Sequence, residues 1–78
     1  MGMKIDELNA AVVGEGCLGK AAPDEPVFIL RAQDKLSARL VRVWANWAED
    51  NDCPPAKVKE ARELAEAMEN WPHRKYPD

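Results

Sequence analysis

The sequence predicts a small all-α protein: a helical hairpin preceded by a short N-terminal helix and followed by an extended C-terminal tail. Apolar residues recur three and four positions apart in two segments, about 26–49 and about 55–70. The turn-forming run Asn51-Asp52-Cys53-Pro54-Pro55 separates them. The 78 residues suffice for one domain at most. We therefore expect a single domain, in which 1–25 form the N-terminal helix and a glycine-rich loop, 26–70 the hairpin and 71–78 the tail.

The N-terminal helix is expected over residues 3–13. Ile5, Leu8 and Val12 are spaced three and four apart, and the acidic pair Asp6-Glu7 suits the positive end of a helix dipole. Glycines then end the helix, and residues 14–25 read as an irregular segment.

Within that segment, residues 14–19 have the form GxGxxG. In dinucleotide-binding folds such glycines let the backbone approach a pyrophosphate at the start of a helix. Here Pro23 and Pro26 interrupt the helix that should follow, and too little chain remains for the rest of that fold. We interpret the run as a flexible loop and expect no bound cofactor.

The first hairpin helix is expected to begin near Pro26, because proline is well tolerated in the first turn of a helix. Its apolar stripe comprises Ile29, Ala32, Leu36, Leu40, Val43 and Trp47. The Ser37 hydroxyl can bond to the backbone, so a kink or a break near 35–37 remains open.

The second hairpin helix is expected to end before Trp71-Pro72, since the residue before proline avoids the helical region. Its apolar face comprises Val58, Ala61, Leu64, Ala65 and Met68. This alanine-rich face is too narrow to cover the apolar arc of the first helix. We therefore expect the N-terminal helix or another subunit to cover the remainder, and a homo-oligomer is the favoured state. The three tryptophans, Trp44, Trp47 and Trp71, are expected in the core, with an interface as the alternative.

Positive charge is concentrated in the first hairpin helix of an otherwise acidic chain. Residues 26–48 hold four basic residues against one acidic residue, whereas the formal net charge of the chain is −3. On a continuous helix the four basic residues would form one stripe beside the apolar face, able to bind carboxylate or phosphate groups. With a nearby indole and two basic residues of the tail, the expected ligand-binding set is Arg31, Lys35, Arg39, Arg42, Trp44, Arg74 and Lys75. A solvated helix face is the alternative.

Other classes of function are disfavoured. Nucleic-acid binding normally needs a basic surface. The single histidine, His73, has no nucleophile beside it in sequence, so we expect no enzymatic activity. Cys17 and Cys53 lack the spacing of metal ligands and are expected to be reduced thiols. With no long apolar run for a membrane span or a signal peptide, we expect a cytoplasmic protein.

Two segments resemble small uncharacterised proteins encoded by bacteriophages and prophages. The first is residues 17–34, with the run Glu25-Pro26-Val27-Phe28 followed by Leu30-Arg31-Ala32-Gln33-Asp34; the second is the ending 68–78, with Trp71-Pro72 and Pro77-Asp78. Members carry proline near the position of Ala38, which this chain does not. The resemblance implies a setting, a mobile-element protein inside a bacterial host cell, and no assigned activity.

Size and setting suggest two functions by analogy alone. The leading expectation is a non-enzymatic oligomeric module that binds an anionic ligand, such as a nucleotide second messenger, and so counters host defence. The alternative is a factor that binds or inhibits a host protein through its apolar and tryptophan surface.

Overall fold

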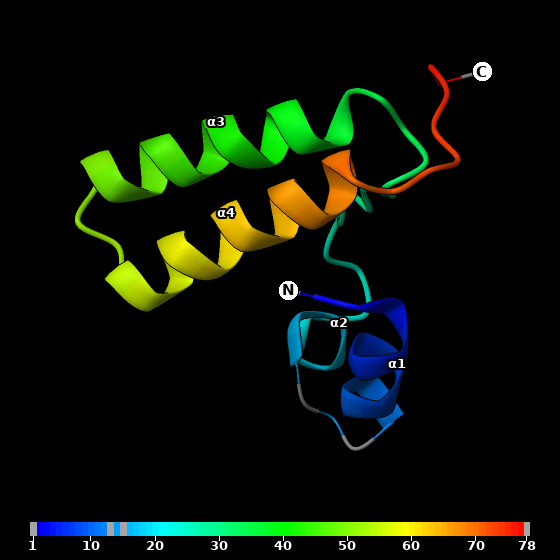
Figure 1. The fold of residues 1–78 in the computed structure, drawn as a ribbon. Helices are drawn as coiled ribbons and strands as arrows, with labels where there is room; N and C mark the ends of the chain where they lie inside the picture. Colours follow the sequence, from blue (N-terminus) through cyan, green and yellow to red (C-terminus); the bar gives the residue numbers. More distant parts are fainter. Residues whose placement is uncertain (1, 13, 15, 78) are drawn as a thin grey trace.

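The computed structural model describes residues 2–12, 14 and 16–77, and its fold is all-α. Four helices follow one another along these described residues: α1 (Lys4–Val12), α2 (Gly16–Lys20), α3 (Ser37–Asp50) and α4 (Pro55–Glu69). Helices α3 and α4 form the expected antiparallel hairpin, and α1 and α2 form a separate pair (Figure 1). No described helix has the length and apolar character that crossing a membrane requires.

The N-terminal helix covers Lys4–Val12 of the expected range 3–13; Met3 is not helical, and Val13 lies outside the described residues. The following loop is less irregular than expected, because α2 forms within it. Gly14 and Gly16 have φ values of 76° and 72°, a backbone conformation that glycine adopts without steric cost, and they turn the chain between the two helices.

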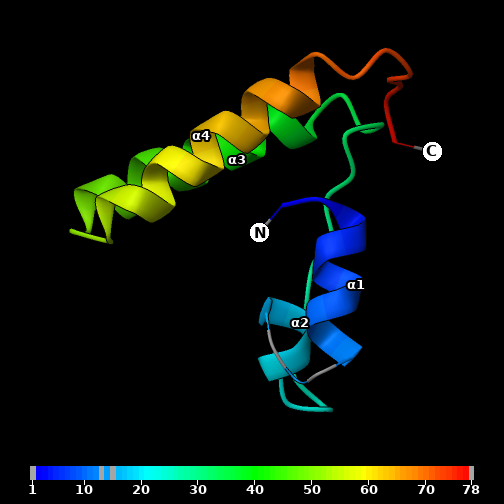
Figure 2. The same cartoon turned by 60° about the horizontal axis from the view of Figure 1, so that its bottom comes forward.

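Neither α1 nor α2 packs against α3 or α4 along the described ranges, and two views 60° apart show the pairs separated (Figures 1 and 2). The expectation that the N-terminal helix could cover the hairpin is therefore wrong. The described part of α1 and α2 therefore leaves the excess apolar surface of the hairpin uncovered.

The first hairpin helix begins at Ser37 and not near Pro26. The position at which a kink or a break was left open, 35–37, is therefore where the helix starts. Residues 26–31 are in no helix, and turns follow up to Leu36. Aromatic and β-branched side chains at 27–29 favour an extended backbone. The Asp34 carboxylate accepts the Leu36 N–H at 2.7 Å, and the buried Ser37 hydroxyl donates to the Arg31 carbonyl at 2.7 Å. Local side-chain bonds thus satisfy the backbone in place of a helical turn.

The hairpin core is built from small residues. The buried set is Ala38, Val41, Ala45, Ala48, Val58, Ala61, Ala65 and Met68. The face expected for α4 is confirmed, with Leu64 half-buried. The stripe expected for α3 is wrong, because Leu40 and Trp47 are exposed and the adjacent alanine side faces α4. Alanines let the two backbones approach closely, whereas larger side chains would hold them apart.

The C-terminal tail folds back on the start of α3. The Lys35 N–H donates to the Lys75 carbonyl at 2.8 Å, and the Lys75 N–H donates to the Gln33 carbonyl at 2.7 Å. These bonds form an isolated parallel bridge between Asp34 and Lys75. The tail therefore closes the open end of the hairpin.

Candidate functional site

The predicted basic stripe does not exist as one helix face. Because α3 begins at Ser37, Arg31 and Lys35 lie in the segment before it, and only Arg39 and Arg42 are helical. The prediction failed because it extended one helical period through a segment that is not a helix. The seven expected ligand-binding residues are thus distributed over several places.

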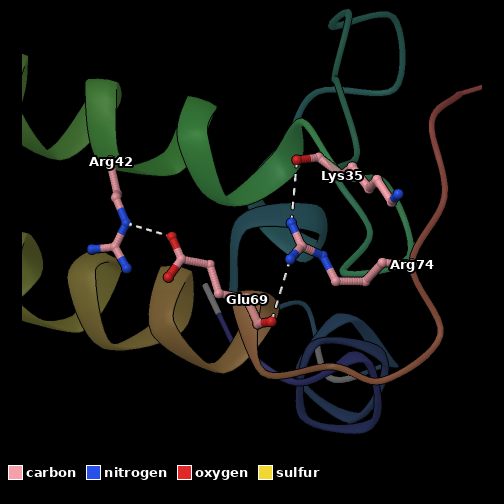
Figure 3. A network of polar contacts seen from close by, with 4 residues as sticks. All are labelled: Lys35, Arg42, Glu69 and Arg74. Carbon is pink, nitrogen blue, oxygen red and sulfur yellow. Dashed lines mark hydrogen bonds and ion pairs between the residues drawn. The ribbon is translucent and has the colours of Figure 1, made fainter.

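Arg42 is engaged within the hairpin. Its Nε donates to Oε1 of Glu69 at 2.9 Å, between α3 and α4 (Figure 3). This hydrogen bond, opposed in part by desolvation, raises the pKa of Arg42 and lowers the pKa of Glu69. The guanidinium therefore joins the two helices and already has a carboxylate partner.

Three other predicted residues, Lys35, Arg39 and Arg74, do meet at the open end of the hairpin. They line a cleft of about 360 Å³ together with Leu36, Ala38, Glu69 and Tyr76. The Lys35 ammonium lies 5.0 Å from the centroid of the Tyr76 ring, a cation–π contact. Three residues of the expected set are therefore neighbours in space.

Arg74 has a structural position in this cleft. Its Nη1 donates to the Glu69 carbonyl at 3.3 Å and its Nη2 donates to the Lys35 carbonyl at 3.2 Å (Figure 3). A cation at the C-terminal end of α4 also interacts favourably with the helix dipole. Arg74 therefore ties the tail to the end of α4 and to the segment that precedes α3, and two of its guanidinium N–H groups are engaged in these bonds. Of the remaining predicted residues, Arg31 and Lys75 are exposed outside this cleft.

The most distinctive surface is an exposed apolar side of α3. Leu40, Val43, Trp44 and Trp47, here called the α3 apolar face, lie within an arc of about 100° on the helix. The exposed fractions are 47% for Leu40, 45% for Trp44 and 65% for Trp47, and Val43 is half-buried. Trp71 is also half-exposed, at 49%. The expectation that the tryptophans form the core is wrong, because alanines fill it.

The opposite side of the hairpin is polar, and its contacts between the two helices were not predicted from the sequence. Arg62 donates to Glu49 at 2.9 Å and to Asn46 at 3.2 Å between the two helices. Arg62 and Glu49, together with Arg42, line an open groove of about 690 Å³. Pairing across helices cannot be read from sequence spacing, because it depends on how α4 is turned toward α3. Since its arginines are paired with carboxylates, the groove offers no concentrated charge.

Residues suited to catalysis or metal binding are dispersed. His73 lies on the exposed tail with its ring edge-on to Trp71, at a centroid distance of 6.4 Å. Among the described residues no three His, Cys, Asp or Glu side chains are grouped to hold a metal ion. Both Cys17 and Cys53 are free thiols.

Comparison with models of protein families, with curated proteins and with solved structures finds no match. Two surfaces of the chain stand out as candidate binding sites: the α3 apolar face, and the cleft lined by Lys35, Arg39 and Arg74.

Proposed function

We propose that this protein is a non-enzymatic binding module that recognises an amphipathic helix of a protein partner through the α3 apolar face. The exposure of Trp44 and Trp47 is the observation that carries the proposal. Tryptophan is the residue most enriched among the energetic centres of interfaces, where it is desolvated on binding.

The area of the surface supports the same function. Taking about 150–250 Å² for each aromatic side chain, the exposed fractions of Trp44 and Trp47 leave roughly 170–270 Å² uncovered. A standard interface buries about 800 Å² on each partner. The two indoles therefore supply a substantial part of a small interface, with Leu40 and Val43 beside them.

The hairpin itself does not need these indoles. Its core closes with the small residues of α3 and α4, and none of the three tryptophans is among its buried residues. Exposed indoles three residues apart on one side of a helix cost solubility without stabilising the hairpin. The spacing of Leu40, Trp44 and Trp47 is that of a surface which receives a second helix.

Site-specific photo-crosslinking tests the proposal. A photoreactive benzoylphenylalanine replaces Trp47 in one variant and, as a matched control, Lys59 on the polar side of α4, whose side chain is 79% exposed. Irradiation in the producing cell, followed by mass spectrometry of the adducts, should give a defined protein adduct from position 47 and none from position 59. Equal labelling from both positions, or no adduct at 47, would overturn the proposal.

The cleft at the open end of the hairpin favours a second function, the binding of a small anion such as a nucleotide. Lys35, Arg39 and Arg74 line it, and the one carboxylate among its lining residues, Glu69, accepts a hydrogen bond from Arg42. Calorimetry with inorganic phosphate and a panel of cyclic nucleotides tests this reading. Binding should be lost in Arg39→Ala and kept in Arg31→Ala, and no heat with any of the anions would exclude it.

A further inference from the structure

The charges on α3 are placed against the dipole of the helix. Arg39 and Arg42 lie in its first half, and Glu49 and Asp50 lie in its last turn. A helix dipole favours the reverse order, with acidic residues first and basic residues last. Because this order of charges destabilises an isolated α3, it points to another interaction that compensates for the unfavourable charges.

Two of these four charges already have partners in α4. Arg42 pairs with Glu69, and Glu49 pairs with Arg62. Arg39 and Asp50 are exposed, and the ion pairs found between described residues include neither. They are the charges available to a partner of the α3 apolar face.

Arg39 and Asp50 lie along the same edge of that face. They are eleven residues apart, close to three full turns, so both side chains lie beside the Val43 edge of the face. At about 1.5 Å of rise per residue they are separated by about 16 Å along the helix axis. Trp44 lies midway between them.

We infer that the partner helix is α3 of a second copy of this chain, packed antiparallel with the twofold axis near Trp44. This inference rests on the proposed function and names its partner. An isologous interface requires a surface that is complementary to itself. A twofold axis perpendicular to two antiparallel helices places the same edge of each helix side by side, with the two edges running in opposite directions. Arg39 of each copy therefore meets Asp50 of the other copy.

A parallel pair would lack this complementarity. Its twofold axis runs along the helices and brings opposite edges together at the same end, so Arg39 would not approach Asp50. Helices α1 and α2 do not compete for the face, since neither packs on α3. Because the face is smaller than a standard interface, we expect a dimer with a dissociation constant in the micromolar range.

Sedimentation equilibrium of charge variants tests the pairing. In Arg39→Glu and in Asp50→Arg, the two symmetry-related charge attractions between positions 39 and 50 become repulsions. The dissociation constant of the dimer should then rise by about 5-fold or more. The double variant R39E/D50R restores opposite charges across the axis and should recover wild-type affinity. Arg31→Glu, which makes the same charge change at an exposed position outside α3, is the matched control and should leave the dimer unchanged.

Disulfide formation gives a second readout in a Cys17→Ser/Cys53→Ala background. Mixing R39C with D50C should give a disulfide between the two chains, because antiparallel pairing brings these positions into facing contact. Each variant alone places its two thiols about 16 Å apart along the axis, which is too far for a bond. A disulfide from R39C alone, but none from the mixture, would overturn the antiparallel arrangement.

Two further results would overturn the inference. One is a wild-type chain that stays monomeric up to about 100 µM, well above the expected range. The other is a dimer that none of the charge variants affects. A monomeric chain whose position 47 crosslinks to a different protein would refute self-pairing and leave the proposed function standing. A monomeric chain with no adduct at position 47 would refute both.

Discussion

The Arg42 guanidinium donates from Nε to Oε1 of Glu69 at 2.9 Å and so joins the middle of α3 to the last residue of α4. A carboxylate at the C-terminal end of a helix is disfavoured by the helix dipole. Arg42, with a smaller contribution from Arg74, offsets that effect and lowers the pKa of Glu69. The pair therefore helps to fix how the two helices lie side by side, and it removes Arg42 from the predicted ligand site.

The ion pair predicts how the Glu69 carboxyl titrates. The pKa of the Glu69 carboxyl is lower in the folded state than in the unfolded state. The ionised carboxylate therefore stabilises the fold fully at pH values above the unfolded-state pKa, and this stabilisation is lost as the pH falls through the folded-state pKa. Carboxyl NMR titration should show a lowered pKa in the wild type and an ordinary pKa in Arg42→Ala. In Glu69→Gln the melting temperature should fall less steeply than in the wild type as the pH is lowered through the acid range. An unchanged Glu69 titration in Arg42→Ala would contradict the assigned cause.

The buried Ser37 hydroxyl should stabilise the start of α3. Ser37→Ala removes its 2.7 Å hydrogen bond and leaves the Arg31 carbonyl without that donor, at an expected cost of about 1 kcal/mol in free energy of unfolding. Urea denaturation measures this cost. Arg31→Ala is the control, because it keeps the carbonyl that accepts the bond and should change stability little.

Close packing of alanines should make the hairpin intolerant of larger residues. Ala61 is 0% exposed between the helices, so Ala61→Leu overfills the contact and should cost about 1–3 kcal/mol. The same change at Ala67, which is exposed on α4, should lie within about 0.5 kcal/mol of the wild type. Equal unfolding midpoints for the two variants would contradict the observed packing.

Arg74 should hold the tail against the hairpin. Its two guanidinium bonds reach the carbonyls of Glu69 and Lys35. In Arg74→Ala we expect faster hydrogen exchange at the Lys35 and Lys75 amides, which bond within the bridge. Arg74→Lys should not restore protection, because an ammonium lacks the fork that spans two carbonyls. Protection that survives in both variants would show that the bridge holds without this residue.

The two helix pairs should differ in local stability. Helices of nine and five residues are marginal in water, and no described side chain of α1 or α2 is buried. Hydrogen exchange followed by mass spectrometry should therefore show faster exchange over residues 4–20 than over α3 and α4. Comparable protection in both regions would indicate that α1 and α2 are buried against a partner.

The sequence by itself determined the all-α class, the turn at 51–54 and the extent of α4. Proline at its first position, a repeating apolar face and Trp71-Pro72 at its end are local signals, and the helix from Pro55 to Glu69 follows them. The start of α3 was not determined in this way. Apolar spacing continues through 26–36, while the Ser37–Arg31 bond and the bridge to Lys75 decide that this segment is not helical.

The tertiary structure alone decided which residues became surface. Val41 and the alanines of α3 face α4, because small side chains allow the closest approach, and Trp44 and Trp47 are left outside. It also divided the predicted basic stripe, pairing Arg42 with Glu69 and gathering Lys35, Arg39 and Arg74 in one cleft. Periodicity shows that a helix has two apolar sides, but only contact with the second helix settles which of them is buried.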